Sequence, residues 1–101
     1  MRANKPELFH NYPNPFNPST AIEYFLHVPS RVTLNVYDAI GRTVGTVSEG
    51  NEERGWYMVN WNGVGNSGRQ AASGVYFYKL SGVSSASGTG FSIVKKMVIV
   101  R

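Results

Sequence analysis

Apolar and polar residues alternate along most of the chain in short runs, and turn-forming residues separate these runs. The segment RVTLNVYD, Arg31 to Asp38, places Val32, Leu34 and Val36 on one face and polar or aromatic side chains on the other. A period of two residues is typical of a half-buried β-strand, and no run shows the helical period. Six or seven such runs, mostly about 8–12 residues apart, predict an all-β sandwich.

The expected strands cover residues 21–28, 31–38, 43–48, 56–61, 75–80 and 91–100. A turn is expected at DAIGR, a polar loop at NEERG, a long glycine-containing loop over 62–74 and a flexible hairpin loop over 81–90. The last strand has no clean apolar face, because strict alternation places Lys95 beside Met97. Either a β-bulge at Lys95 and Lys96 switches the register, or both faces of MVIV are covered.

The stretch NYPNPFNPST, Asn11 to Thr20, combines three prolines with two aromatic residues. A residue before proline is restricted to extended or turn geometry, so the stretch is stiff. We expect this stretch to be an ordered lead-in segment, with the side chains of Tyr12 and Phe16 buried at one end of the sandwich. Residues 1–11 are then expected to be a linker or an expression remnant, and residues 12–101 the domain.

Composition limits the classes of function. The chain has 101 residues, enough for one small domain, and no cysteine for a disulfide or thiolate metal site. Its net charge is +4, and its basic residues are scattered along the chain, with Lys95 and Lys96 as the only adjacent pair. Nucleic-acid surfaces usually have clustered basic residues, so this pattern disfavours nucleic-acid binding. No run could span a membrane, and the first ten residues lack the apolar core of a signal peptide, so an export signal would lie outside this chain.

Candidate catalytic groups are few. Glu49, Glu52 and Glu53 cluster in a polar stretch where solvent would keep them from acting as a tuned acid or base. His10 and His27 have no third ligand to complete a zinc site. We therefore expect no catalytic residue, no metal site, no cofactor and no enzymatic activity, although weak calcium binding by the glutamates stays open.

Aromatic residues supply an alternative function. If they faced solvent together, they could stack on sugar rings, although strand alternation must bury about half of them. The residues concerned are Trp56, Tyr57, Trp61, Tyr76, Phe77 and Tyr78. A carbohydrate-binding or adhesive module attached to a secreted enzyme is therefore the alternative.

Five segments in a fixed order carry a resemblance to a known family. They are Tyr12–Leu26, Val32–Val44, Val59–Gly63, Ser67–Leu80 and Lys95–Arg101. In this order they resemble the type A C-terminal sorting domain of type IX secretion cargo, which is also similar to the Ig-like domain of the flagellar hook-capping protein. The departures are Asn62, where the family usually has Asp, and the long 81–90 loop.

The resemblance implies an Ig-like β-sandwich of about seven antiparallel strands. Its structural motif residues would be Tyr12, Pro13, Asn14, Pro15, Phe16, Asn17, Pro18, Gly41, Trp61, Gly63 and Gly74. Gly41 and Gly63 are expected to supply positive φ in turns.

The resemblance also implies a function. The domain would direct a cargo protein fused upstream through the periplasm and the outer membrane, to be secreted or held at the cell surface. Its partners would be the outer-membrane secretion machinery and a sortase-like protease. Sorting would depend on the terminal segment, which comprises Lys95, Lys96, Met97, Val98, Ile99, Val100 and Arg101. A structural module of a flagellar cap and a strand-swapped dimer stay open.

Overall fold

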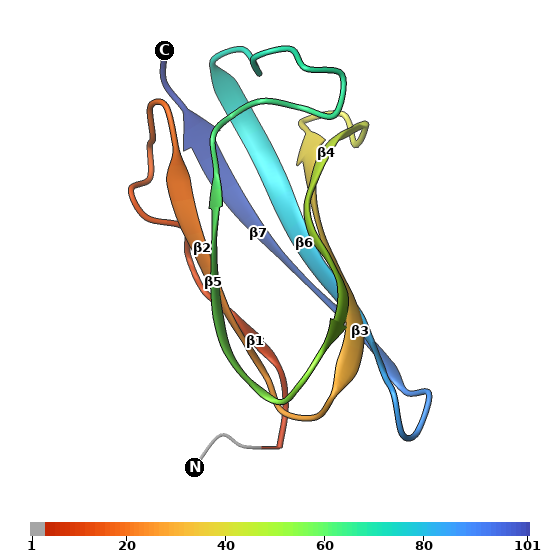
Figure 1. Cartoon of the computed structure of the whole chain (residues 1–101). Helices are drawn as coiled ribbons and strands as arrows, with labels where there is room; N and C mark the ends of the chain where they lie inside the picture. Colours follow the sequence, from red (N-terminus) through yellow and green to blue (C-terminus); the bar gives the residue numbers. More distant parts are fainter. Residues whose placement is uncertain (1–3) are drawn as a thin grey trace.

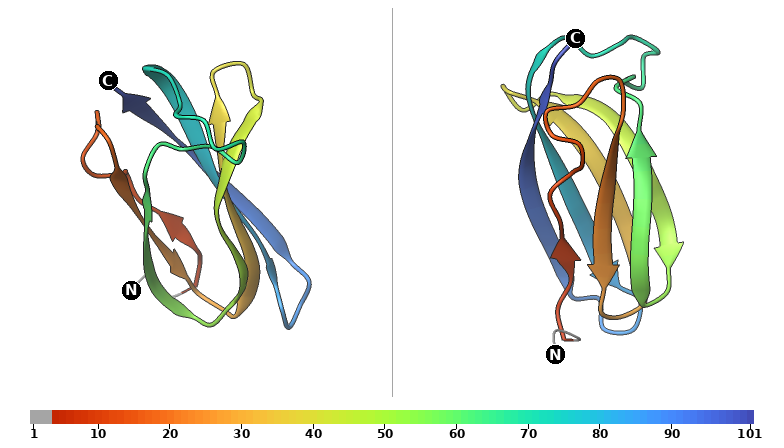
Figure 2. Two further views of the ribbon diagram at one scale, coloured as in Figure 1. Left: turned by 45° about the horizontal axis from the view of Figure 1, so that its top comes forward. Right: turned by 90° about the vertical axis from the view of Figure 1, so that its left-hand side faces the viewer.

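Two antiparallel β-sheets face each other in the computed structural model, which describes residues 4–101 (Figure 1). The three-stranded sheet has the order β1-β2-β5, formed by β1 (Glu7–Leu8), β2 (Thr20–Leu26) and β5 (Gly55–Trp61). The four-stranded sheet has the order β4-β3-β6-β7, formed by β4 (Thr43–Glu52), β3 (Ser30–Asp38), β6 (Gly74–Ser84) and β7 (Gly90–Ile99). This arrangement confirms the predicted all-β, Ig-like sandwich (Figure 2).

The core lies between the inner faces of the two sheets. Alternate residues of β3 are buried there, so Val32, Leu34 and Val36 occupy the face that their spacing predicted. Tyr24 comes from β2 and Tyr78 from β6, and both are fully buried. Within residues 4–101 there is no helix of the length and apolar character that a membrane crossing requires.

The last strand keeps its alternation without a bulge. Its pairing with β6 is unbroken, and Tyr78 pairs with Lys95 while Phe77 pairs with Lys96. The predicted bulge is therefore wrong, and Lys95 shares the core-facing side with the buried Met97. Lys95 is only half-buried, because a lysine at a sheet edge can cover apolar surface with its stem while its ammonium reaches water.

Two strands are longer than the apolar pattern indicated. β4 continues to Glu52, whose partner in β3 is Ser30, so part of the expected NEERG loop is strand. β6 continues to Ser84, which shortens the expected 81–90 loop. Backbone pairing extends both strands, and it needs no apolar side chain.

The fold begins earlier than expected. β1 pairs with β2, and Leu8 lies in the core, so residues 7–11 belong to the sandwich rather than to a linker. Residues 1–3 of the expected linker lie outside the described residues. The burial of Phe16 is confirmed, but the burial of Tyr12 is wrong, since its side chain is 80% exposed. Tyr12 pairs with Ala21, and neighbouring strand residues point to opposite faces, so Asn11 is buried instead.

Candidate recognition site at the C-terminal strand

The outer edge of β7 is partly covered by the lead-in segment, residues 11–20 (Figure 1). The Phe16 N–H donates to the Val98 carbonyl over 3.1 Å, and the Val100 N–H donates to the Phe16 carbonyl over 3.1 Å. The Asn14 side-chain oxygen accepts a further bond of 3.0 Å from the Val98 N–H. The C-terminal half of the last strand is therefore already paired within the domain.

The lead-in segment is held by a polar network. The Thr20 hydroxyl donates to the Pro13 carbonyl over 2.9 Å, and the Asn11 amide donates to the Thr20 hydroxyl over 3.0 Å. The Tyr78 hydroxyl donates to the Phe9 carbonyl over 2.7 Å and accepts from the Asn11 N–H over 2.9 Å. Burial raises the pKa of Tyr78 to about 12. The stretch is thus a fixed part of the domain.

Phe16 and Trp61 close the core beneath the lead-in. Their ring centroids lie 6.0 Å apart in an edge-on arrangement, and both side chains are buried. The Trp61 Nε1–H donates to the Val64 carbonyl over 3.0 Å. Trp61 is therefore part of the hydrophobic core.

The last residue is anchored to the long loop that follows β5. The Arg101 backbone N–H donates to the Ser73 hydroxyl over 2.9 Å, and its guanidinium donates to the carbonyls of Ala71 and Gly63. Gly63 has a φ of +77°, and a Cβ at this position would lie 2.7 Å from Nη2 of Arg101. A glycine here therefore satisfies the turn and leaves room for the guanidinium.

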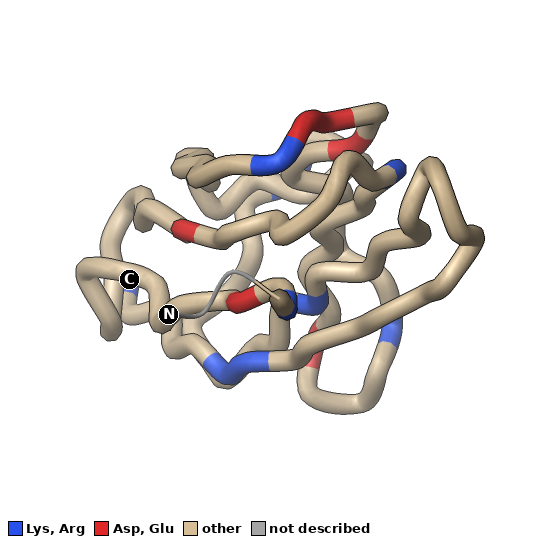
Figure 3. The backbone as a smooth tube through the Cα atoms, turned by 90° about the horizontal axis from the view of Figure 1, so that it is seen from below, with Lys and Arg blue, Asp and Glu red and all other residues tan. Residues whose placement is uncertain are grey.

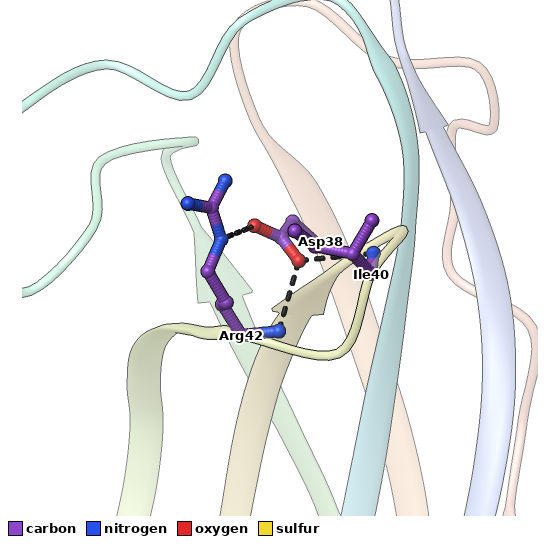
Figure 4. Close-up of polar contacts among 3 residues, drawn as sticks. All are labelled: Asp38, Ile40 and Arg42. Atoms are coloured by element: carbon purple, nitrogen blue, oxygen red, sulfur yellow. Dashed lines mark hydrogen bonds and ion pairs between the residues drawn. The ribbon is translucent and has the colours of Figure 1, made fainter.

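The DAIGR turn between β3 and β4 is a local structure (Figure 4). The Asp38 carboxylate accepts from the backbone N–H groups of Arg42 at 2.9 Å and Ile40 at 3.1 Å, and from the Arg42 side chain at 2.8 Å. These bonds, chiefly the one from the Arg42 backbone, hold the pKa of Asp38 below its ordinary value. Gly41 adopts the expected positive φ, at +91°.

Most of the predicted terminal segment faces inward or is engaged. Met97 and Ile99 are buried in the core. Val98 and Val100 pair through their backbones with the lead-in segment, and Arg101 is anchored as described above. Lys96 and Val100 present exposed side chains. The structure thus gives this segment a stabilising role, and its role in sorting stays a prediction.

Sequence reasoning missed the remaining edge of β7. Because Val98 directs its N–H and C=O toward the lead-in segment, alternate residues direct theirs to the same edge. These residues are Lys96, Val94 and Ser92, and no strand pairs with that side among residues 4–101. The signal in the sequence is the strict alternation of 91–99, which indicates a regular strand. In such a strand successive residues point their backbone groups to opposite edges, so the pairing of Val98 determines which residues face the open edge.

The aromatic residues do not form one platform. Trp61, Tyr76 and Tyr78 are buried in the core. Trp56 stacks against Phe9 at 5.6 Å on the three-stranded sheet, whereas Phe77 belongs to the other sheet. A continuous sugar-stacking surface from the predicted set is therefore wrong.

The acidic residues do not gather into a metal site. The Glu52 carboxylate accepts a 2.6 Å hydrogen bond from the Tyr24 hydroxyl, and burial is the main cause that raises the pKa of Tyr24. No group of three or more His, Cys, Asp or Glu residues that could hold a metal ion occurs in the described part of the chain. Charged positions are spread over several elements (Figure 3).

Comparison with known proteins gives one family and several similar structures. The model of the FlgD Ig-like domain family matches residues 18–86. The structure of dimeric latent PorU from Porphyromonas gingivalis is similar with a TM-score of 0.78 and 21% identity, over 94% of this chain and 9% of that one. FlgD from P. aeruginosa is similar with a TM-score of 0.61 and 23% identity, over 95% of this chain and 68% of that one.

A further structure is PorZ from Porphyromonas gingivalis, described as an essential bacterial surface component of the type IX secretion system. It has a TM-score of 0.49 and 20% identity, over 93% of this chain and 11% of that one. No curated protein matches the chain. The chain thus spans about a tenth of the length of PorU and of PorZ.

Proposed function

We propose that this chain, which belongs to the FlgD Ig-like domain family, is a non-catalytic sorting domain for the type IX secretion system. It directs a cargo protein attached upstream across the outer membrane, to be secreted or displayed on the cell surface. Its partners are the outer-membrane machinery and a sortase-like protease. Support comes from the order of the five family-like segments and from where the structure brings them together.

One observation carries the proposal, which is that the family-like segments meet at one end of the sandwich. Arg101 bonds to Gly63 of the third segment and to Ala71 and Ser73 of the fourth. Phe16 of the first segment pairs with the terminal strand. Residues far apart in sequence therefore build one rigid surface around the chain terminus, which suits recognition by another protein better than it suits turnover of a substrate.

The placement of the acidic residues supports a non-catalytic role. Asp38 is committed to the backbone of its own turn, and Glu52 accepts the Tyr24 hydroxyl. Both carboxylates are therefore engaged in bonds that serve local structure.

The test is export of a reporter. A signal peptide, a fluorescent protein and this domain are fused in that order and expressed in a bacterium with a type IX system and in a strain lacking its outer-membrane pore. We expect surface or medium fluorescence only in the first strain. A fusion with an unrelated β-sandwich of similar size is the control. Periplasmic retention of the folded fusion in both strains would refute the proposal and favour a structural module like the one in FlgD.

A further inference from the structure

The outer edge of β7 has two halves, which differ in whether another segment of the chain is hydrogen-bonded to them. The half at Val98 to Val100 is covered by the lead-in segment. The half from Ser92 to Lys96 presents backbone N–H and C=O groups to the outside. β1 lies near β7, but no strand of residues 4–101 is hydrogen-bonded to this half. An open edge of this kind is a template for an added strand.

Of the three other edge strands, β1, β4 and β5, the first two are blunted. β1 contains only two residues. β4 is irregular, with register shifts opposite Leu34/Asn35 and Val36/Tyr37, and Asn66 bonds to its edge through Val44 and Thr46. Bulges and covering loops discourage strand addition, and the free half of β7 has neither.

Side chains next to the free edge define the chemistry of a partner. The outer face of the four-stranded sheet holds a shallow groove of about 480 Å³ lined by Tyr37, Phe77, Lys79 and Val94. Lys79 lies over the Tyr37 ring, with Nζ 5.3 Å from the centroid. Lys96 is exposed on the same face, since it pairs with Phe77. The groove is therefore apolar with a basic rim.

The positive charge around the groove favours an acidic partner over a second copy of this chain. Asp38 borders the groove, but it is bonded to Arg42, so it does not offset the two lysines. A second copy of this chain would bring another net charge of +4. An extended segment with acidic residues opposite Lys95 and Lys96, followed by apolar residues opposite Ile93 and Val94, matches both the charge and the apolar surface.

We propose that the free edge of β7 from Ser92 to Lys96 accepts an antiparallel, acidic-to-apolar strand of a partner protein. Docking therefore involves only the first two residues of the terminal segment, Lys95 and Lys96, and not its buried side chains Met97 and Ile99. The strand-accepting edge follows from the fold, and only the identity of the partner as part of the secretion machinery rests on the proposed function.

The direct test uses the full chain and the synthetic peptide Thr-Glu-Glu-Val-Val-Thr with blocked ends. Amide chemical shifts measured by NMR during titration should move for Ser92, Val94 and Lys96 and stay fixed for β4. The same peptide with N-methylated valines is the control, since it keeps the charges but loses backbone donors. Equal binding of the two peptides, or no shift at millimolar peptide, would overturn the proposal.

Two variants separate the contribution of backbone hydrogen bonds to peptide binding from the contribution of charge. Val94→Pro removes an outward N–H and no bond to β6, so the domain should stay folded by circular dichroism but bind the peptide at least roughly tenfold more weakly. Lys96→Glu should weaken binding by roughly tenfold. A peptide in which lysine replaces glutamate should restore the binding of this variant. Unchanged binding by folded Lys96→Glu would contradict the charge assignment even if Val94→Pro failed to fold.

The same variants are then placed in the reporter fusion. Export of the native fusion together with loss of export for Lys96→Glu and Val94→Pro is the expected result. Export of all three would overturn the docking edge and leave the proposed function intact. Peptide binding without export of the native fusion would refute the proposed function alone. A dimer in sedimentation that Val94→Pro abolishes would assign the edge to a second copy and overturn the acidic partner.

Discussion

The contact between Gly63 and Arg101 offers a sharp test of how the chain terminus is held. A Cβ at position 63 would lie 2.7 Å from Nη2 of Arg101 and 3.2 Å from the Pro18 carbonyl. Gly68 has a similar φ, +85° against +77°, but nothing lies within 4 Å of its Cβ position. The substitutions Gly63→Ala and Gly68→Ala therefore share their backbone strain and differ in the contact with Arg101.

The magnitudes follow from two terms. An alanine in the left-handed region costs about 1–2 kcal/mol, and both substitutions carry this term. Only Gly63→Ala displaces the guanidinium and breaks its 3.1 Å bond to the Gly63 carbonyl, which adds about 1 kcal/mol for a partly exposed bond. We expect a loss of about 1–2 kcal/mol for Gly68→Ala and about 2–3 kcal/mol for Gly63→Ala.

The assay is urea unfolding followed by tryptophan fluorescence, since Trp61 is buried near the contact. Gly63→Ala is measured in the native chain and with Arg101→Ala, which completes a double-mutant cycle. The additional loss at position 63 should shrink by about 1 kcal/mol when Arg101 is absent. Equal effects of Gly63→Ala and Gly68→Ala, or a loss at 63 that does not depend on Arg101, would refute the reasoning.

The remaining predictions concern the lead-in segment. Phe16→Ala should lower the free energy of unfolding by about 3 kcal/mol, measured by thermal denaturation, because a buried ring is lost; an unchanged melting temperature would return residues 11–20 to linker status. Tyr78→Phe should cost about 1–3 kcal/mol, because the Asn11 N–H and the Phe9 carbonyl lose their partner. The folded-state pKa of Tyr78, about 12, lies above its ordinary value of 10.0, so its contribution to stability is complete below pH 10 and falls as the pH rises toward 12. Alkaline unfolding scans should therefore show a shallower loss in Tyr78→Phe, and an identical slope would contradict this assignment.

The alternation of apolar residues was sufficient to predict the sandwich and much of its core. Val32, Leu34 and Val36 lie where a period of two places them, because one face of β3 meets the opposite sheet. Strand ends were less predictable, since Glu52 and Ser84 continue their strands by backbone pairing alone.

The site depended on contacts that leave no local pattern. The bond between Asn14 and Val98 joins residues 84 positions apart, and the lead-in pairs through main-chain groups that any residue carries. The choice between Tyr12 and Asn11 for the interior was decided by the pairing of Tyr12 with Ala21. A proline-rich stretch predicts stiffness, but it does not show which edge the stretch will cover.

The terminal segment contributes to the core and is also expected to take part in recognition, so the effect of deleting it must be interpreted with both roles in mind. Removing Lys95 to Arg101 should leave an attached cargo in the periplasm, as recognition by the machinery would require. The deletion also removes Met97 and Ile99 from the core and exposes Phe16. Each buried apolar side chain contributes about 2–5 kcal/mol, which together approaches the whole stability of a small domain. We therefore expect the truncated domain to lose its cooperative melting transition, so that retention alone would follow from unfolding as well. The substitution Lys96→Glu leaves the core and the lead-in pairing intact, so it separates loss of recognition from loss of folding. A truncated domain that kept its native melting transition and still lost export would instead assign recognition to the terminal segment itself.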